Sequence, residues 1–503
     1  MKLIKALIPL LLCISSASAT TPPNIIYILA DDMGVGDVHA LNPEAKVATP
    51  NIDSLVANGM HFTDAHTPSS VCTPTRYSIM TGRYSWRSEL KKQVVGGYSR
   101  ALISPDRDTV ASLLKRNGYQ TAMIGKWHLG LDWKLKDGST VTELYEPKGI
   151  EAQIDFTQPF RNGPVDLGFG SWYGINASLD FPPYTWLQDD HVVEVPTIAR
   201  PFQGGKKVGQ PQTMMRSGLQ TADFDPALTL KGLTEHAVTY IQDMDTTKPF
   251  FLYMPLNSPH TPVVPRDAFL GKSQAGIYGD FIQETDWSVG QVIAALKDRG
   301  LLENTLIIFT ADNGASKASF TPEMETEYGH NPSATYKGRK GSLDEGGHRV
   351  PFIAQWPAVI AADSRNDTPC NLIDLYATCA DLLDVKIEPD TAEDSISMRP
   401  LFESNNDAYT RSEMVHHDFG GRFAFRQGKW KLITSPFSKK QALYDMVADP
   451  SETTNVLKAH PEVVEQMEHR LTAIVQDGRS TPGPKQTNEG PAWWPELVWI
   501  EQP

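Results

Sequence analysis

Acidic and amide residues end two apolar segments of the sequence. Asp31 and Asp32 close the run NIIYILADD, and Asp312 and Asn313 belong to the end of the run NTLIIFTADNG. Three carboxylates and one amide make a hard oxygen cage, which suits calcium or magnesium better than zinc. Either pair alone could equally cap a following helix or turn. Two such pairs, each placed after an apolar run, favour a metal site.

Five cationic or titratable side chains stand on predicted loops or helix starts next to strand ends. They are Arg76, Lys126, His128, His260 and Lys340. A tetrahedral anion needs hydrogen-bond donors from several directions, and a bound calcium ion would add positive charge opposite them. Taken one at a time, each is better explained as a surface or turn residue. Together they predict an anion site beside the metal.

Cys72 lies in the stretch SSVCTPTRYSIMTGR, at the start of a predicted helix through Tyr77 to Thr81. A helix N-terminus binds anions and lowers the pKa of a thiol. Cys72 could therefore be the nucleophile of a cysteine hydrolase, or simply a buried structural cysteine. Calcium does not favour sulfur ligands, however. A thiol beside an oxygen-rich metal cage thus indicates a residue that is chemically changed at this position.

The first 19 residues have the features of a secretory signal peptide: two lysines, a short apolar run and a small-residue cleavage pattern. We expect an exported protein, periplasmic or secreted, that is cleaved after about Ala19. No later apolar run is long enough to cross a membrane. Three cysteines then remain, so at least one is unpaired. Cys370 and Cys379 could pair with each other or stay buried thiols.

The composition limits the partners of the protein. The chain has 503 residues, with 46 basic and 60 acidic side chains and a formal net charge of −14. Such a charge argues against nucleic acid or an anionic membrane as a general partner. An anionic substrate would therefore need a local cationic pocket on an acidic protein.

Apolar strands alternate with amphipathic helices through the first two-thirds of the sequence. The pattern predicts an α/β fold: a large mixed, mostly parallel β-sheet sandwiched by helices, with ligands bound beyond the carboxyl ends of its strands. We assign residues 20–380 to this domain and expect residues 381–503 to form a smaller α+β domain with an antiparallel sheet. The predicted strands are 24–32, 61–67, 119–128, 249–260, 304–314 and 349–357, and the main helices are 51–59, 109–118, 286–296 and 461–476.

The segments CTPTRYSIMTGR and GYQTAMIGKWHLG are similar to the two signatures of the formylglycine-dependent sulfatases, within the alkaline phosphatase superfamily. The motifs SPHTP, TADNG and KGSLDEGGHRVP follow in the expected order, so the resemblance spans nearly the whole mature chain. It implies that a formylglycine-generating or anaerobic maturation enzyme oxidises Cys72 to Cα-formylglycine. It also implies one calcium ion, held by Asp31, Asp32, Asp312, Asn313 and the modified Cys72.

The resemblance also implies roles for the cationic residues. Lys126 and Lys340, with calcium, would neutralise the sulfuryl oxygens while a hydroxyl of the hydrated formylglycine attacks sulfur. His260 would protonate the departing alcohol, and His128 would take a proton when sulfate is expelled. Arg76 would orient the modified residue.

Substrate choice in this family lies in variable loops. Export and the resemblance to bacterial carbohydrate sulfatases imply a sulfated carbohydrate, such as sulfated N-acetylgalactosamine of a glycosaminoglycan or an algal polysaccharide. Ordinary loop packing is the simpler explanation for any single loop residue. The candidates for contacting the sugar are Ser178, Asp180, Tyr184, His330 and His417.

Two other functions compete with this interpretation. The nearest is a phosphomonoester or phosphodiester hydrolase of the same superfamily, although such enzymes use a Ser or Thr nucleophile and two zinc ions. The other is an inactive glycan-binding homologue, which would require that Cys72 remain a thiol or that the metal be absent.

Overall fold

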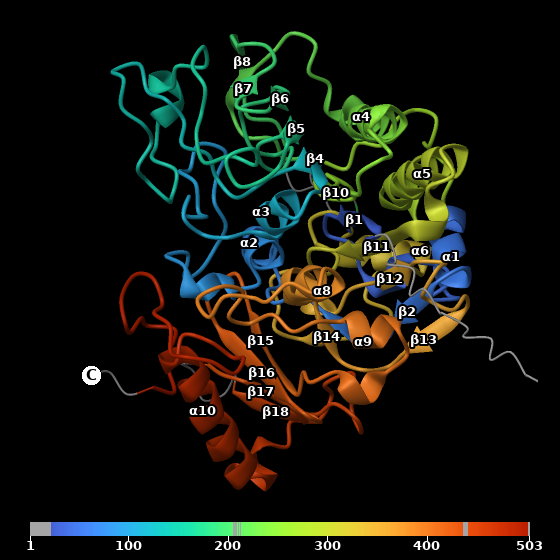
Figure 1. Cartoon of the computed structure of the whole chain (residues 1–503), viewed down its shortest axis with the longest axis vertical. Helices are drawn as coiled ribbons and strands as arrows, with labels where there is room; N and C mark the ends of the chain where they lie inside the picture. Colours follow the sequence, from blue (N-terminus) through green and yellow to red (C-terminus); the bar gives the residue numbers. More distant parts are fainter. Residues whose placement is uncertain (1–21, 205–208, 210, 212, 436–440, 501–503) are drawn as a thin grey trace, which may run out of the picture.

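The computed structural model describes residues 22–500, apart from 205–208, 210, 212 and 436–440. The expected signal peptide, residues 1–19, lies outside the described residues. Among the helices that are described, none has both the length and the apolar character needed to cross a membrane. The chain forms a large sheet covered by helices and a smaller antiparallel sheet near the C-terminus (Figure 1).

The large sheet has ten strands, in the order β13 (Ser364–Asn366), β2 (Met60–Phe62), β12 (Phe352–Gln355), β11 (Thr305–Ala311), β1 (Asn24–Ala30), β10 (Phe250–Pro255), β4 (Gln120–Lys126), β5 (Ser171–Ile175), β6 (Leu187–Gln188) and β7 (His191–Val192). The five strands from β11 to β5 are parallel to one another. β12 runs antiparallel to β11 and to β2. The prediction of a mixed, mostly parallel sheet is confirmed.

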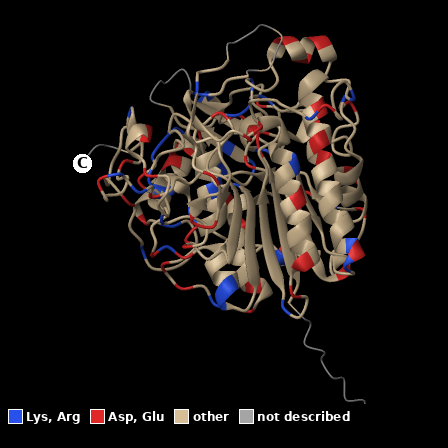
Figure 2. Cartoon of the chain, turned by 90° about the horizontal axis from the view of Figure 1, so that it is seen from above, with Lys and Arg blue, Asp and Glu red and all other residues tan. Residues whose placement is uncertain are grey.

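The central strands are apolar from end to end. β1 reads NIIYILA, β10 reads FFLYMP and β11 reads TLIIFTA, and all of these residues except Asn24 are buried. In Figure 2 the middle of these strand ribbons is accordingly tan, without the colours of Lys, Arg, Asp or Glu. Continuous apolar runs are what a parallel sheet needs when both of its faces are covered. These three strands therefore carry no charged side chain, and the acidic residues of the first and third follow directly after their ends.

Helices cover both faces of the sheet, as the alternating pattern predicts. Helix α5 begins earlier than expected, at Gly276 instead of Asp286, because Tyr278, Phe281 and Ile282 continue its buried face. Figure 1 shows one group on one side, α1 (Pro50–Ala57), α4 (Thr229–Asp243) and α5 (Gly276–Asp298), and a second group on the other side, α2 (Cys72–Thr81), α3 (Val110–Arg116) and α8 (Leu375–Leu382).

The predicted single strand at residues 61–67 is wrong, because the chain changes sheets there. β2 pairs with the large sheet, whereas β3 (Ala65–His66) pairs with β14 (Cys370–Asn371) in a separate two-stranded ladder. The carbonyl of Thr63 between them accepts hydrogen bonds from the Arg349 guanidinium. The break directs the following residues towards the start of α2.

The C-terminal part carries the expected antiparallel sheet. A long helix, α10, packs against it and contributes Leu471 and Ile474 to its core. Helix α8 runs across residue 380, and the exact division at that residue stays a prediction. The four strands and the helix are β15 (Glu413–His417), β16 (Phe423–Gln427), β17 (Trp430–Ile433), β18 (Ala442–Asp445) and α10 (Pro461–Gln476).

The remaining regular elements are short. They are β8 (Ile198–Arg200), β9 (Gly218–Gln220), α6 (Pro322–Tyr328), α7 (Glu345–His348) and α9 (Arg399–Phe402), besides several single turns of 3-10 helix.

Candidate active site

The parallel pairing of β1 with β11 brings the two acidic motifs together. Ala30 is in register with Ala311, so the residues that follow them leave the sheet side by side. The Asp312 N–H donates to the carbonyl of Ala30 at 3.1 Å, and the Asp32 N–H donates to Asp312 Oδ1 at 3.2 Å. His260 joins them from the end of β10, within reach of a shared ion.

All ten residues singled out for metal binding and catalysis gather at this edge of the sheet or border it directly. We call them the sheet-edge cluster. They are Asp31, Asp32, Cys72, Arg76, Lys126, His128, His260, Asp312, Asn313 and Lys340.

Helix α2 places Arg76 one turn after Cys72, beneath the two acidic motifs. The Arg76 guanidinium is fully buried and pairs with Asp312 Oδ2 through Nε at 2.9 Å and Nη2 at 2.7 Å. Its Nη1 donates to the carbonyl of Lys126 at 3.0 Å. Arg76 thereby fixes the helix against both β11 and β4 and neutralises one carboxylate of the cluster.

Several buried oxygens of the cluster have no hydrogen-bond partner within the described part of the chain. These are Asp31 Oδ1, Asp32 Oδ2 and Asn313 Oδ1. Leaving buried, charged oxygens unpaired is costly unless a cation completes the site. Carboxylate and amide oxygens are the ligands that calcium prefers. The residues present therefore fit a hard divalent cation.

Two lysines face this oxygen-rich site. Lys126 Nζ lies 2.6 Å from Asp31 Oδ2, and Lys340 Nζ lies 2.6 Å from Asp32 Oδ1. Burial alone would raise the pKa of the Asp31 carboxyl, but Lys126 and His260 outweigh it and hold that pKa well below its usual range. Burial likewise opposes the charge of Lys340, yet Asp32 raises its pKa above the ordinary value. These shifts favour the charged forms of Asp31 and Lys340.

His128 is arranged as a buried neutral base. Its Nε2 lies 3.0 Å from the carbonyl of Val95, so Nε2 carries the proton and Nδ1 keeps its lone pair. Nδ1 is buried and has no partner among the described residues. Burial, then the charges of Lys126 and Arg76, lowers the pKa of His128 well below the ordinary value. A neutral imidazole with a free lone pair can accept a proton.

His260 lies at the open side of the cluster. It retains 9% of its exposure, its Nδ1 contacts the carbonyl of Thr261 at 2.5 Å, and its Nε2 lies 3.7 Å from Asp32 Oδ2. Because Nδ1 is engaged by a carbonyl, Nε2 is the nitrogen that faces the metal ligands. The ring is placed to give a proton to a group bound there.

The expected low pKa of the Cys72 thiol is wrong. Burial raises that pKa, and although Lys126 and Lys340 oppose the rise, they do not overcome it. The thiol is 3% exposed and forms no disulfide. Cys370 and Cys379 are also free, buried thiols. Cys72 therefore lacks the exposure and low pKa that a reactive cysteine nucleophile needs.

Three of the predicted sugar-reading residues lie on the loop beside His128. Ser178 Oγ and Asp180 Oδ1 are buried and have no partner among the described residues. The neighbouring Phe181 ring lies 5.6 Å from the His128 ring, which brings this loop to the cluster. Tyr184 is buried and donates its O–H to the carbonyl of Arg216 at 2.7 Å. Ser178 and Asp180 have free polar atoms, whereas Tyr184 supports the loop.

His330 and His417, the other two predicted sugar contacts, are buried inside the protein. His330 is fully buried, its Nε2 lies 2.9 Å from Asp37 Oδ1, and its Nδ1 accepts from a backbone N–H. His417 is also fully buried, and its carbonyl accepts hydrogen bonds from Ser69 and Ser70 before the helix α2. Burial lowers the pKa of His417 to about 4. Packing accounts for both ring nitrogens of His330, whereas neither ring nitrogen of His417 has a hydrogen-bond partner among the described residues. The sugar-contacting roles of both residues stay predictions.

The sequence interpretation missed Phe181 and Arg216, which border the same loop. The Arg216 guanidinium lies 3.6 Å from the centre of the Phe181 ring and pairs with Asp180. No periodic pattern marks these residues, because they come from irregular loops. The signal that the sequence offered for Arg216 was a cationic residue in a loop rich in Gly, Pro and aromatic residues.

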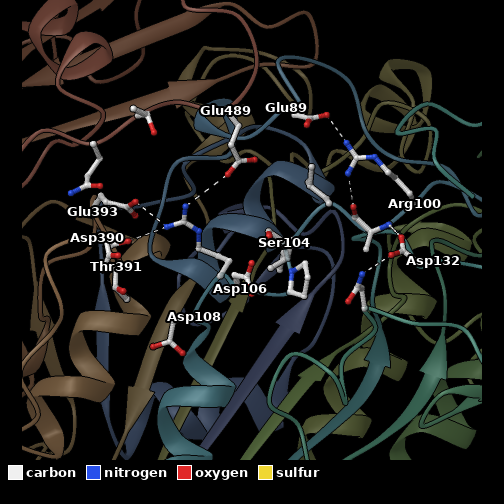
Figure 3. A pocket seen from close by; sticks show the side chains of 18 residues that line it. Glu89, Arg100, Ser104, Asp106, Asp108, Asp132, Asp390, Thr391, Glu393 and Glu489 are labelled. Atoms are coloured by element: carbon white, nitrogen blue, oxygen red, sulfur yellow. Dashed lines mark hydrogen bonds and ion pairs between the residues drawn. The ribbon is translucent and has the colours of Figure 1, made fainter. Parts of the chain in front are cut away.

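A pocket of about 710 Å³ lies elsewhere and has the wrong charge for a sulfate ester. Seven carboxylates and two arginines line it, and none of the sheet-edge cluster does. Figure 3 shows Glu393 and Asp390 converging on an arginine, Arg107, which donates to Glu393 at 3.0 Å and to the carbonyl of Asp390 at 3.1 Å. The excess of carboxylates over arginines in this lining would repel an anion.

Comparison with known proteins identifies the family. The family model described as Sulfatase matches residues 23–385, which is most of the chain. The protein is a member of the sulfatase family. A second model, N-sulphoglucosamine sulphohydrolase, C-terminal, matches residues 339–477. The protein is therefore a sulfuric ester hydrolase, and its fold is that of this family.

Relatives of this sulfatase cover nearly its whole length. An N-acetylgalactosamine-6-O-sulfatase of Bacteroides thetaiotaomicron is 32% identical over 497 residues, which cover 90% of this chain and 93% of the relative. Human arylsulfatase A is 31% identical over 526 residues, which cover 96% of this chain and 94% of the relative. A solved B. thetaiotaomicron sulfatase, from work on the metabolism of multiple glycosaminoglycans, has a TM-score of 0.79 at 32% identity and covers 90% of this chain and 99% of that one.

These comparisons confirm the family and the reaction class expected from the motifs. Sulfatases in general use a metal ion and a formylglycine, and the unpaired oxygens of this chain fit the former. The phosphoester hydrolase and the inactive glycan-binding protein are correspondingly disfavoured.

Proposed function

We propose that this sulfatase removes a sulfate ester from N-acetylgalactosamine in a glycosaminoglycan, using calcium and a formylglycine made from Cys72. The observation that carries the proposal is the meeting of Cys72, two lysines and the unpaired oxygens at one sheet edge. The sugar is inferred from the B. thetaiotaomicron N-acetylgalactosamine-6-O-sulfatase, which matches over 90% of this chain. An algal polysaccharide is the second candidate substrate.

The proposed calcium ligands are Asp31, Asp32, Asp312, Asn313 and the modified Cys72. The bound ion supplies positive charge against the sulfate oxygens, and the hydrated aldehyde of formylglycine supplies a hydroxyl nucleophile that also suits an oxygen-preferring metal. A serine at this position would lack the second hydroxyl that lets the sulfate be expelled.

The chain's own residues hold the sulfate and move the protons. Lys126 and Lys340 neutralise the charge that develops on the sulfuryl oxygens. His260 Nε2 gives a proton to the leaving sugar oxygen, and His128 Nδ1 accepts the proton released with the sulfate. Arg76 holds α2, and with it residue 72, in place through Asp312.

We infer further that the protein is exported and that Cys72 is converted before folding is complete. At 3% exposure, Cys72 in the folded chain is closed to a maturation enzyme. The enzyme would therefore act on the extended segment around Pro74 and Arg76. This assigns a formylglycine-generating or anaerobic maturation enzyme as a partner.

The test is an assay of protein produced with and without a formylglycine-generating enzyme. We expect sulfate release from 6-sulfated N-acetylgalactosamine, and little or none from 4-sulfated N-acetylgalactosamine, sulfated galactose or a phosphomonoester. Cys72→Ser and the unmatured protein should fold and be inactive. Turnover by the Cys72→Ser variant equal to that of the matured wild type would overturn the mechanism. Turnover of sulfated galactose alone would overturn N-acetylgalactosamine as the substrate.

A further inference from the structure

A pocket of about 470 Å³ opens next to the sheet-edge cluster, and two chain segments connect the two. The carbonyl of Val95 contacts His128, and Tyr98, three residues later, lines the pocket. The Phe181 ring lies 5.6 Å from the His128 ring, and Pro182 lines the pocket. The volume falls in the range of small-molecule sites. If the sugar that carries the sulfate ester lies at the sheet-edge cluster, the sugar attached to it can therefore reach this pocket.

Arg216 lines the pocket and is held in place by two contacts. Its guanidinium lies 3.6 Å from the centre of the Phe181 ring, and its Nη1 donates to the carboxylate and the carbonyl of Asp180. The side chain is still 40% exposed, and no described residue accepts a hydrogen bond from Nε or Nη2. A positioned guanidinium with free donors binds carboxylate and sulfate groups in a fixed geometry.

The other charges of the pocket leave its cations available. Glu151 accepts hydrogen bonds from Tyr98 and from a backbone N–H, and Glu146 accepts the backbone N–H of Tyr98 at 3.2 Å. Lys148 is exposed and forms no ion pair with any residue that the structure describes. Phe202, 59% exposed, adds an apolar face. Neutral donors thus bind both carboxylates, and neither forms an ion pair with Arg216 or Lys148 among the described residues, so both cations can contact a ligand.

We propose that Arg216, assisted by Lys148, binds a negatively charged group on the sugar next to the one that carries the sulfate ester under attack. A carboxylate of a uronate and a second sulfate have the required chemistry. The inference rests on the proposed function, because it needs a sulfated glycan in the sheet-edge cluster. It makes Arg216 the residue that selects an anionic chain over a neutral one, with Asp180 and Phe181 as its positioning residues.

The test compares Arg216→Met with the wild type, both matured, on four substrates. These are the sulfated monosaccharide, its disaccharide with a uronate, the same disaccharide with the carboxyl reduced to an alcohol, and one with a second sulfate in place of the carboxyl. We expect Arg216→Met to lower kcat/KM on the uronate disaccharide by about tenfold to a hundredfold. Reducing the carboxyl should lower the kcat/KM of the wild type by a similar factor, whereas the kcat/KM of Arg216→Met should hardly change.

Arg161→Met is the matched control, because Arg161 is 62% exposed, pairs with Asp190 and does not line the pocket. Arg161→Met should keep the wild-type preference for the uronate disaccharide over the reduced one. Arg216→Lys should keep part of that preference. A loss in Arg216→Met that is equal on all four substrates would overturn the proposal, as would a wild type indifferent to both charged groups. If the second sulfate alone restores the preference, the ligand is a sulfate.

A binding measurement separates this proposal from the proposed function. In a Cys72→Ala background, Arg216→Met should weaken the Kd for the uronate disaccharide more than that for the reduced one. This comparison needs no turnover. Absence of turnover with any sulfate ester would overturn the proposed function alone, whereas equal Kd ratios in the two proteins would overturn the role of Arg216.

Discussion

Two buried groups of charged side chains differ in how completely they are paired. The sheet-edge cluster leaves carboxylate and amide oxygens without partners. A second group, which we call the histidine network, lies between the large sheet and the C-terminal antiparallel sheet and satisfies nearly all of its charges. Its members are Asp64, His66, Glu345, His348, Arg349, His416, Arg426, Lys431 and Glu452.

The pairing within the histidine network is reciprocal. Lys431 Nζ lies 2.9 Å from Glu345 and 2.8 Å from Glu452. Arg426 pairs with Asp64 at 2.9 Å. Each buried charge that is paired costs little further free energy, whereas one left unpaired is costly. The comparison teaches that unpaired buried atoms, more than buried charge itself, distinguish a ligand site from a structural one.

Ligand type alone does not make this distinction. His66, His348 and His416 lie close enough together to suggest a metal site. The His348 and His416 rings, however, stack at 3.9 Å with an angle of 14° between their planes, so their in-plane lone pairs do not meet at one ion. Lys431 Nζ also lies 2.9 Å from His348 Nε2. The charges of the network are thus paired with one another, and among the described residues His416 Nε2 is left without a hydrogen-bond partner.

The largest expected effect is on stability, from Lys431→Met. The change leaves Glu345 and Glu452 buried without their shared cation and should lower the free energy of unfolding by about 3–5 kcal/mol. Urea unfolding measures it. The folded fraction should keep wild-type turnover, because the network does not contact substrate.

The matched control for that experiment is Lys429→Met. Lys429 lies two residues away and pairs with Asp445 at 2.6 Å, but it is 50% exposed. An exposed pair contributes about 0–1 kcal/mol. Equal losses of stability in Lys429→Met and Lys431→Met would break the comparison between closed and open clusters.

Lys340→Met should do the opposite and remove turnover while sparing the fold. Losing one group that neutralises the developing charge on sulfate should lower kcat/KM by about 10²–10³-fold. In calcium, the ion should balance the charge of Asp32, so the unfolding free energy should change little. Lys337→Met, a nearby exposed lysine paired with Asp344, is the control and should behave as wild type. An active Lys340→Met would contradict the assignment.

A smaller effect is expected from pH. Burial lowers the pKa of His66, and it lowers the pKa values of His348 and His416 further. These rings are neutral in the folded protein, whereas the unfolded chain takes up protons below about pH 6.5. Stability should therefore be complete above about pH 7 and fall with decreasing pH, by up to about 1.4 kcal/mol per pH unit for each histidine.

The measurement is the unfolding free energy between pH 5 and 8 in calcium. His416→Gln should reduce the slope, because it removes one of the buried histidines that take up a proton only when the chain unfolds. A stability that is independent of pH over this range would show that the histidines are not held neutral.

Strand ends were the part of the site that the sequence could predict. Asp31, Lys126 and Asp312 follow apolar runs, and parallel pairing necessarily brings such positions to one edge. The signature around Cys72 added the helix that carries the nucleophile. These features depend on local pattern and on a rule of sheet topology, so no knowledge of distant contacts was needed.

Loop residues could not be placed in the same way. His330 and His417 lie in polar stretches but are fully buried, because residues far away in the sequence cover them. The thiol pKa of Cys72 depended on burial, which outweighs the opposing charges of Lys126 and Lys340. Arg216 reaches Phe181 across an irregular loop. Each of these facts depends on tertiary packing that no short pattern encodes.

Calcium binding by the chelated protein tests the central claim most directly, because that claim concerns the unpaired oxygens of the sheet-edge cluster. Titration calorimetry should find one calcium ion per chain. Asp32→Ala should abolish binding, and Lys431→Met, which alters only the closed network, should retain it. Absence of calcium binding in the wild type, or binding that persists unchanged in Asp32→Ala, would contradict the account.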